Sequence, residues 1–296
     1  MGICLGISLI VKQDYNAYDQ LVRYKWWWKE GYMSSTGRCF DIGSATNKSL
    51  TEFIRRQNLF IEKYNIPPED IDTLSDEQIQ LFNKEWPMNC SEPDAAGNGA
   101  LMRLAPLPLF FCRSPQDAIY NAGKSALLTH GDVRSADACR YYAALIVSAA
   151  LNATKKDLLE DDFYQKCCKK GWFRDKPLHK EIEEIAQGSY KKQGGYDDGI
   201  RGKGYVVKAL EAALWAFWSD ENSFEIGALH AVNLGDDTDT TAAIYGQLAG
   251  VVYGIDKIPE KWIKKLYAKD FLNCLAEWLN YAGSEWYEPK IQNSKL

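Results

Sequence analysis

Histidine is scarce in this 296-residue chain. The three histidines, His130, His179 and His230, are far apart in the sequence, which argues against a metal site built mainly from histidine. An excess of positive charge is also lacking, since 35 Lys and Arg stand against 40 Asp and Glu, for a net charge of -5. This balance argues against nucleic acid as a partner, because phosphate backbones are bound through basic surfaces.

Paired cysteines and long apolar runs are missing as well. The eight cysteines are scattered without a CxxC pair, which predicts reduced thiols in a cytoplasmic protein. The apolar start "MGICLGISLIV" lacks a basic leader and is too short to cross a bilayer. We therefore expect a buried helix there and no membrane association.

Strand patterns are rare, with "GRCFDIG" as one short candidate. Helical spacing recurs instead, as in "AYDQLVRYKWWWKEGYM", and the helix in "SPQDAIYNAGKSALLTHG" is expected to end at Gly131. Near the C-terminus, "IPEKWIKKLYAKDFLNCLAEWLNYAG" predicts two short helices. We predict an all-α fold in a single domain over residues 1–296, with polar loops at 33–50, 87–100 and 187–204.

Three aspartates, Asp236, Asp237 and Asp239, crowd into "LGDDTDTTAAI". Gly235 is expected to end one helix and the run after Thr241 to begin the next, so the acids lie at a corner between helices. One acid is enough to cap a helix. Three acids followed by threonine hydroxyls also suit a hard cation such as Mg²⁺, Mn²⁺ or Ca²⁺. The spacing leaves capping and metal binding both open.

Two other polar segments are candidates for a site. In "AAGNGALMRLAPLPLF", Gly97 and Gly99 flank Asn98, which suits a loop whose amides approach a ligand, although an ordinary glycine turn is the simpler explanation. Asp41 lies between apolar neighbours in "STGRCFDIGSAT". Burial there would suit its carboxylate to bind sugar hydroxyls or act as a base. A turn aspartate that caps the next helix explains the same pattern.

A histidine and a tyrosine complete the candidates. His130 closes a helix in "LLTHGD", where attraction to the helix dipole is a sufficient explanation. Gly202 and Gly204 precede Tyr205 in "GIRGKGYVVKAL". This flexible lead would let the phenol form one wall of a base-binding slot, or the ring simply packs in the core.

In combination and in this order, "STGRCFDIG", "GNGALMRLAP", the "TH" of "LLTHGD", "GYVVKALEAALWAF" and "AVNLGDDTDTTAAIYGQLAGVVYG" resemble the ADP-ribosylglycohydrolase family. This family includes the dinitrogenase reductase-activating glycohydrolases, and the resemblance covers nearly the whole chain. It implies an orthogonal helical bundle around a cleft that holds two Mg²⁺ or Mn²⁺ ions. It also implies hydrolysis of the N- or O-glycosidic bond between ADP-ribose and a modified protein.

The resemblance further implies roles for individual residues. Asp237, Asp239 and Thr240 would be metal ligands, and the bound ions would lower the pKa of a water so that hydroxide is available near neutral pH. Asp41 and Asp239 would be catalytic, with Asp41 against the ribose. The ADP-ribose site would be lined by the remaining matches, Asn98, Gly99, Met102, His130, Gly204 and Tyr205.

The chain departs from the family at its start. The family usually begins with a helix bearing a Gly-Asp segment and a glutamate, followed by a Thr-Asp-Asp-Thr motif just before the helix found here at residues 1–10. In the sequence from Met1 these elements have no counterpart, so we expect a metal centre that is at most partly formed. Ser44 and Lys203 are smaller departures beside the nucleotide site. The alternative to an enzyme is therefore an impaired ADP-ribose-binding or crystallin-like relative, and we expect a monomer.

Overall fold

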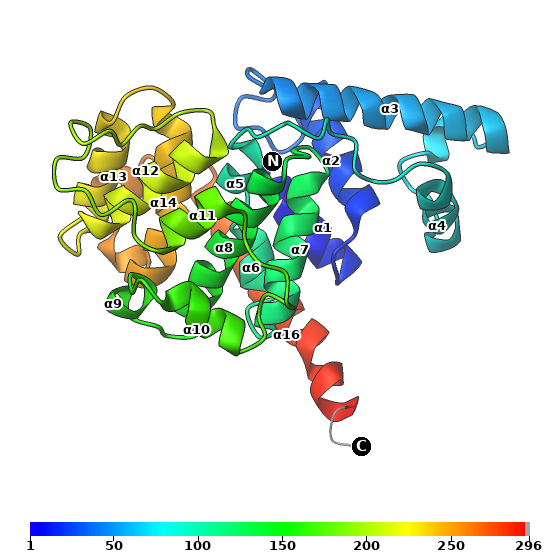
Figure 1. Cartoon of the computed structure of the whole chain (residues 1–296). Coiled ribbons are helices and arrows are strands. Elements are labelled where there is room, and N and C mark those ends of the chain that lie inside the picture. The colour runs from blue at the N-terminus through cyan, green and yellow to red at the C-terminus, as the bar shows by residue number, and fades with distance from the viewer. Residues whose placement is uncertain (294–296) are drawn as a thin grey trace.

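The computed structural model describes residues 1–293. Over that range the chain forms sixteen α-helices, two short 3-10 helices and no strand, which confirms the all-α prediction (Figure 1). The α-helices are α1 Gly2–Lys12, α2 Ala17–Glu30, α3 Ser44–Tyr64, α4 Asp76–Glu85, α5 Gly99–Met102, α6 Pro106–Phe110, α7 Pro115–Leu127, α8 Val133–Ala150, α9 Lys155–Leu158, α10 Phe163–Lys169, α11 Lys180–Ala186, α12 Val206–Trp218, α13 Phe224–Asn233, α14 Thr238–Tyr253, α15 Glu260–Ile263 and α16 Lys269–Asn293. The 3-10 helices are η1 Pro68–Asp70 and η2 Ile255–Lys257.

Helix α8 lies at the centre of the fold. Every residue from Ser135 to Ala149 is buried, and α8 contacts α5, α6, α7, α11, α12 and α14. A helix that is buried all round needs partners on every side, and its many alanines let those partners approach closely. This packing holds the N-terminal end of α8, which begins shortly after His130, in a fixed place.

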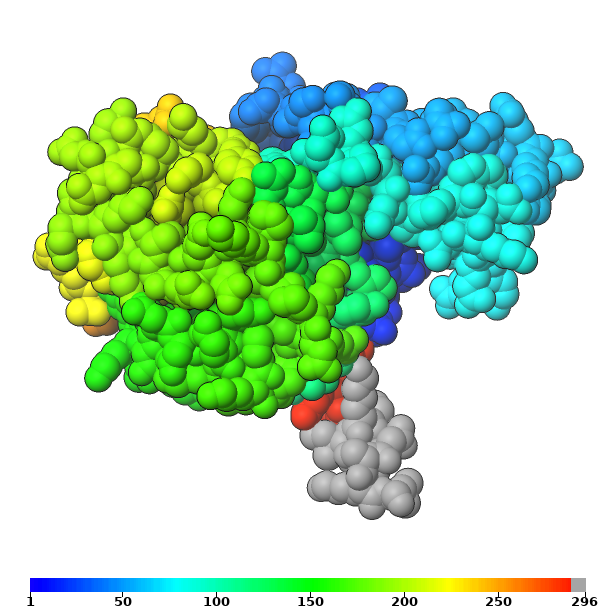
Figure 2. Space-filling view, viewed as in Figure 1, coloured from blue at the N-terminus to red at the C-terminus, as the bar shows by residue number. Residues whose placement is uncertain are grey.

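Helices α3 and α4 form an arm that projects from the rest of the surface (Figures 1 and 2). Four buried aromatic side chains, Tyr18 of α2, Phe53 and Phe60 of α3 and Phe82 of α4, pack edge to face or tilted at the base of this arm. Such aromatic contacts add to the stabilisation from burial itself. They therefore hold the middle and the second half of α3 against α2 and α4.

Several predicted boundaries were wrong. The stretch "GRCFDIG" forms no strand, and the loop predicted at 33–50 ends at Gly43, because α3 begins at Ser44. Helix α7 ends at Leu127, before the predicted stop at Gly131. Residues 128–132 instead form the turn into α8, where the Asp132 carboxylate caps the new helix by accepting a hydrogen bond from a backbone N–H.

Helices in the C-terminal third of the chain also differ from those predicted from the sequence. Helix α14 begins at Thr238, four residues before the apolar run that was expected to start it. The two short helices predicted near the C-terminus are a single turn, α15, and a 25-residue helix, α16. Helix α16 is long because one of its faces packs against α1 and α6. No helix within residues 1–293 is long and apolar enough to cross a membrane.

Candidate active site

A cavity of about 550 Å³ opens where segments far apart in the sequence meet. Its walls come from the start of α1, Trp27 of α2, residues 40–46, the glycine loop at 97–103, His130, Gly204, Asp237, Asp239 and Thr240. Nine of the ten residues to which the family resemblance assigned a role line it, and the tenth, Tyr205, does not. A concave site assembled from several elements is the usual form of a small-molecule site.

The acidic corner turns sharply before α14. Gly235 and Asp236 both have positive φ, at 76° and 57°, so the chain reverses between α13 and α14. The backbone N–H of Asp237 donates to the carbonyl of Gly202 at 2.7 Å, which ties the corner to the loop before α12. A Cβ at Gly202 would lie 2.5 Å from Oγ1 of Thr241, so only glycine allows this approach. Asp236 is exposed and does not line the cavity.

Asp237 occupies the cap position of α14, but its side chain makes no capping hydrogen bond. Instead, Nδ2 of Asn98 donates to Oδ2 of Asp237 at 2.7 Å. The side chain of Asp237 therefore serves the cavity and not the helix end. Asp239, the second residue of α14, is exposed at the same cavity.

The side chains at this corner offer the kind of oxygen ligand that a hard cation prefers, but fewer of them than such an ion needs. Asp237, Asp239 and Thr240 offer carboxylate and hydroxyl oxygens, which Mg²⁺ and Mn²⁺ prefer. Mg²⁺ takes six oxygen ligands in a near-octahedral arrangement. No group of three or more His, Cys, Asp or Glu side chains within residues 1–293 is placed to hold a metal ion. The described residues Asp237, Asp239 and Thr240 thus offer three of these six ligands.

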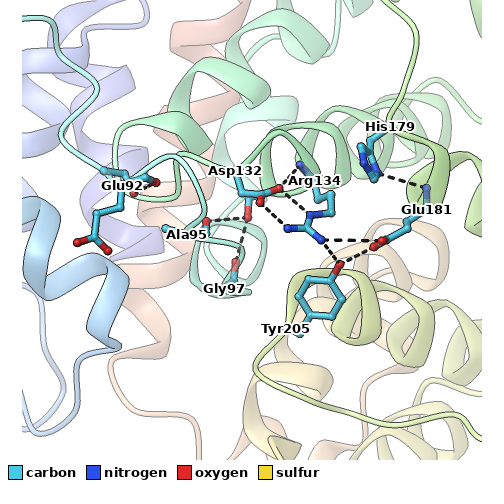
Figure 3. Close-up of polar contacts among 10 residues, drawn as sticks. Glu92, Ala95, Gly97, Asp132, Arg134, His179, Glu181 and Tyr205 are labelled. Atoms are coloured by element: carbon cyan, nitrogen blue, oxygen red, sulfur yellow. Dashed lines mark hydrogen bonds and ion pairs between the residues drawn. The ribbon is translucent and has the colours of Figure 1, made fainter.

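The glycine loop is held against the chain before α12. The backbone N–H of Asn98 donates to the carbonyl of Gly204 at 3.0 Å, and Val206 donates to the carbonyl of Ala96 at 2.9 Å. From α8, the hydroxyl of Ser135 adds longer hydrogen bonds, of 3.4 and 3.3 Å, to the carbonyls of Ala95 and Gly97 (Figure 3). The loop is therefore preorganised, and its small residues leave space above it.

His130 lies directly against this loop. A Cβ added at Gly99 would be 3.1 Å from its imidazole ring, and one at Gly97 would be 3.2 Å away, so both positions favour glycine. The pKa of His130 is lowered to about 3, mainly by burial and to a smaller extent by the positive charge of Arg103. The imidazole is therefore neutral near pH 7.

The hydrogen bonds around His130 indicate its tautomer. Nη2 of Arg103 donates to Oγ1 of Thr129 at 2.6 Å, and this hydroxyl lies 2.9 Å from Nδ1 of His130. Nδ1 is the one acceptor within reach of this hydroxyl among the described residues, so we assign the hydroxyl's proton to the bond with Nδ1. Nε2 of His130 then carries the ring proton and faces Gly97 and Gly99. The histidine thus presents a neutral N–H donor at the cavity wall.

Asp41 differs from its predicted environment. It lines the cavity, but it is exposed, as is the neighbouring Phe40 at 76%. It does not cap α3 either, since Gly43 occupies the cap position without a side-chain bond. Burial of the carboxylate, one of the two alternatives, was therefore wrong: Phe40, Asp41 and Gly43 line the cavity and are all exposed, so this wall of the cavity is open to solvent.

Tyr205 turns its ring away into a separate polar network (Figure 3). Its hydroxyl donates to Glu181 of α11 and accepts from Nη1 of Arg134 at 2.9 Å. Arg134 also forms two hydrogen bonds with the Asp132 carboxylate, and these lower the pKa of Asp132. The backbone of Tyr205 lies beside Gly97, but its phenol is not a wall of the cavity described above.

Arg103 and Trp27 also line this cavity, and neither was singled out from the sequence. Arg103 is only 4% exposed, it stacks over Tyr24 at 4.5 Å, and its Nε and Nη1 have no hydrogen-bond partner among the described residues. A single cation inside the apolar run "LMRLAPLPLF" was the signal that pointed to it. Trp27 is the other. Of the three consecutive tryptophans only its ring lines the cavity, and their order alone does not show which one faces a site.

Known proteins resemble this chain over nearly its whole length. The family profile described as ADP-ribosylglycohydrolase matches residues 1–289. An ADP-ribosylarginine hydrolase Tri1 of Serratia proteamaculans is 31% identical over 288 residues, which cover 96% of this chain and 66% of that protein. A Pseudomonas putida protein of the same name is 33% identical, covering 94% and 63%. This chain thus spans slightly less than two thirds of the length of these two relatives.

Structural comparison agrees with the sequence matches. A solved structure titled "ADP-ribosylglycohydrolase-related protein complex" superposes with a TM-score of 0.70 at 30% identity, covering 95% of this chain and 79% of that one. Both share an all-α architecture. The chain belongs to the ADP-ribosylglycohydrolase family.

Proposed function

We propose that this protein hydrolyses the glycosidic bond between ADP-ribose and a modified protein, with ADP-ribosylated arginine as the first substrate to test. The observation that carries this proposal is the cavity, which gathers Asp41, Asn98, His130 and Asp239 from four separate segments. The names of the two relatives from Serratia and Pseudomonas support arginine as the linkage.

In this proposal the two exposed carboxylates at the cavity have different tasks. Asp239 accepts a proton from the water that attacks the anomeric carbon, while Asp41 accepts hydrogen bonds from ribose hydroxyls and keeps the sugar oriented. The bond from the anomeric carbon to the guanidine nitrogen breaks, and that nitrogen takes up the proton that Asp239 accepted from the water, which returns the carboxylate to its charged form. The neutral His130, with Asn98, Gly99, Met102 and Gly204, lines the remainder of the ADP-ribose site.

We also propose a divalent ion, Mg²⁺ or Mn²⁺, as cofactor, held by Asp237, Asp239 and Thr240. When bound, such an ion lowers the pKa of a coordinated water and polarises substrate oxygens. The Asn98 amide keeps one Asp237 oxygen engaged and so aims the other. The second candidate function is an ADP-ribose-binding protein with little or no turnover, since the described residues offer three of the six oxygen ligands that Mg²⁺ takes.

Release of free ADP-ribose from an arginine-ADP-ribosylated protein, with and without Mg²⁺, tests the proposal. A serine-ADP-ribosylated protein in parallel tests the linkage, and Asp239→Asn is the inactive control. Hydrolysis that depends on Mg²⁺ and on Asp239 supports the enzyme. A rise in the melting temperature with ADP-ribose but no turnover supports the binding protein instead. If ADP-ribose neither binds nor is released, both candidate functions are wrong.

A further inference from the structure

Thr129 lies in the turn between α7 and α8 and is fully buried. Its backbone N–H donates to the carbonyl of Ala126 in α7 at 3.2 Å. Its carbonyl accepts a hydrogen bond from the hydroxyl of Ser49 in α3, also at 3.2 Å. Two helices therefore hold the backbone of Thr129, and its hydroxyl has a defined place beside His130.

The hydroxyl of Thr129 has two partners. Nη2 of Arg103, at 2.6 Å, can only donate to it, because a guanidinium has no acceptor. Nδ1 of His130 lies 2.9 Å away. If Nδ1 carried the ring proton, the hydroxyl would accept from both partners, and its own proton would be buried without an acceptor among the described residues. A buried donor without a partner is costly. Thr129 therefore favours the tautomer in which Nδ1 is bare and Nε2 carries the proton.

The same hydrogen bond selects the orientation of the imidazole ring. A half-turn of the ring about the Cβ–Cγ bond would put a carbon in the place of Nδ1 and break the bond to Thr129. It would also exchange Nε2 with the neighbouring ring carbon. In the observed orientation, Cβ atoms added at Gly97 and Gly99 would lie 3.2 and 3.1 Å from Nε2. Thr129 thus determines where Nε2 lies as well as whether it carries a proton.

Nε2 of His130 has no hydrogen-bond partner among the described residues, although the side chain is only 2% exposed. The ring lines the cavity of the candidate active site. A buried donor that faces a cavity without a protein partner is complementary to an acceptor oxygen of a bound ligand. In the other tautomer the same position would offer a lone pair, which suits a ligand hydroxyl that donates.

We propose that Thr129 is a positioning residue of the candidate active site, which fixes the tautomer and the orientation in which His130 offers Nε2–H to an acceptor oxygen of the ligand. This inference rests on the proposed function, because it takes that ligand to be the ADP-ribose group. Thr129 does not line the cavity, so it acts on the ligand only through His130. A ligand that places a donor opposite Nε2–H is rejected, because two donors then face each other.

A two-bond ¹H–¹⁵N correlation spectrum of the ligand-free chain reads the tautomer directly, because the protonated and the bare ring nitrogen differ in ¹⁵N shift. The chain has three histidines, so the loss of one set of signals in His130→Gln assigns His130. We expect a single Nε2–H tautomer. Thr129→Val keeps the shape of the side chain without the hydroxyl and should give a mixture of tautomers, whereas Thr129→Ser keeps the hydroxyl and should retain Nε2–H. An Nδ1–H tautomer in the unchanged chain, or an unchanged spectrum in Thr129→Val, overturns the inference.

Calorimetric titration with ADP-ribose measures the consequence for binding. Thr129→Val should weaken binding about threefold to tenfold, the change that corresponds to one net hydrogen bond, and Thr129→Ser should restore it. In the His130→Gln background, Thr129→Val should weaken binding no further, because the residue through which it acts is gone. The same loss in both backgrounds would show that Thr129 acts on the fold and not through His130, which contradicts the inference.

These measurements also separate the inference from the proposed function. If ADP-ribose binds the unchanged chain and Thr129→Val equally well, the inference is wrong and the proposed function stands. If the unchanged chain does not bind ADP-ribose, the proposed function is wrong. The spectrum of the ligand-free chain then still decides whether Thr129 sets the tautomer of His130.

Discussion

Asn98 donates a hydrogen bond from Nδ2 to Oδ2 of Asp237 at 2.7 Å, across 139 residues of sequence. The same amide group reaches the carbonyl of Lys203 at 3.3 Å. One side chain thus joins the glycine loop, the loop before α12 and the acidic corner. This bond explains why Asp237 does not cap α14, and it fixes the orientation of the carboxylate that is proposed to hold a metal ion.

Removal of this amide should loosen the acidic corner. For Asn98→Ala we expect a loss of about 1–3 kcal/mol in the free energy of unfolding, because the partly buried carboxylate loses a charge-assisted hydrogen bond. ADP-ribose affinity should fall as well. Urea unfolding and calorimetric titration with ADP-ribose measure the two effects. Asn233→Ala, at an exposed position at the end of α13, is the control and should change neither quantity.

The two acids on either side of Asp237 should behave differently. Asp239→Asn should lower hydrolysis by at least about a hundredfold, the usual effect of removing a general base. It should also abolish any rise in melting temperature produced by Mg²⁺. Asp236→Asn makes the same chemical change at an exposed position outside the cavity and should retain activity. Equal losses in the two variants would show that only the net charge of the corner matters.

His130 should make the protein sensitive to acid. Its pKa is lowered to about 3 in the folded chain by burial and, secondarily, by the charge of Arg103. The unfolded chain binds a proton near pH 6.5, so stability is complete above that pH and is lost as pH falls toward 3. In that window His130 should contribute a fall of about 1.4 kcal/mol in unfolding free energy per pH unit.

Urea unfolding at a series of pH values measures this contribution. His130→Gln should show a shallower dependence than the unchanged chain between pH 6 and pH 4. Because the chain has three histidines, an NMR titration is also readily assigned. Titration of the His130 ring near pH 6.5 in the folded protein would contradict the assignment of a neutral, buried imidazole.

Two glycines on the cavity provide a matched pair. Gly99→Ala places a Cβ 3.1 Å from the His130 ring and should cost about 1–3 kcal/mol of ADP-ribose affinity or stability through overpacking. A Cβ at Gly43 meets nothing within 4 Å, and its φ of -61° suits any residue. Gly43→Ala should therefore be tolerated. Calorimetric titration with ADP-ribose, together with thermal unfolding, distinguishes the two.

The helices were largely predictable because their signals are local. Apolar spacing identified α2, and the Pro at the start of "SPQDAIYNAGKSALLTHG" stands at the first position of α7. The end of α7 and the length of α16 were missed, because both depend on what packs against those helices. Spacing alone could not show that α14 begins at Thr238, since the polar residues there resemble a loop.

The residues of the candidate site could be predicted from the sequence, but their burial and their hydrogen-bond partners could not. Order along the chain was sufficient to select Asp41, Asn98, His130 and Asp237. The sequence could not show that Asp41 is exposed, or that Nε and Nη1 of Arg103 have no hydrogen-bond partner among the described residues. A residue's burial and its hydrogen-bond partner depend on segments that approach from elsewhere in the chain.

The acidic corner separates what the sequence determines by itself from what only the tertiary structure decides. From sequence alone, "GDDTDT" predicts a helix start with more acid than a cap requires, because charge and turn propensity are properties of neighbouring residues. Which carboxylate faces the cavity depends on the reversed chain at Gly235 and on Asn98 arriving from a distant loop. Folding brings these groups within 3 Å of each other, and only at that distance does a hydrogen bond select Asp237 over Asp236.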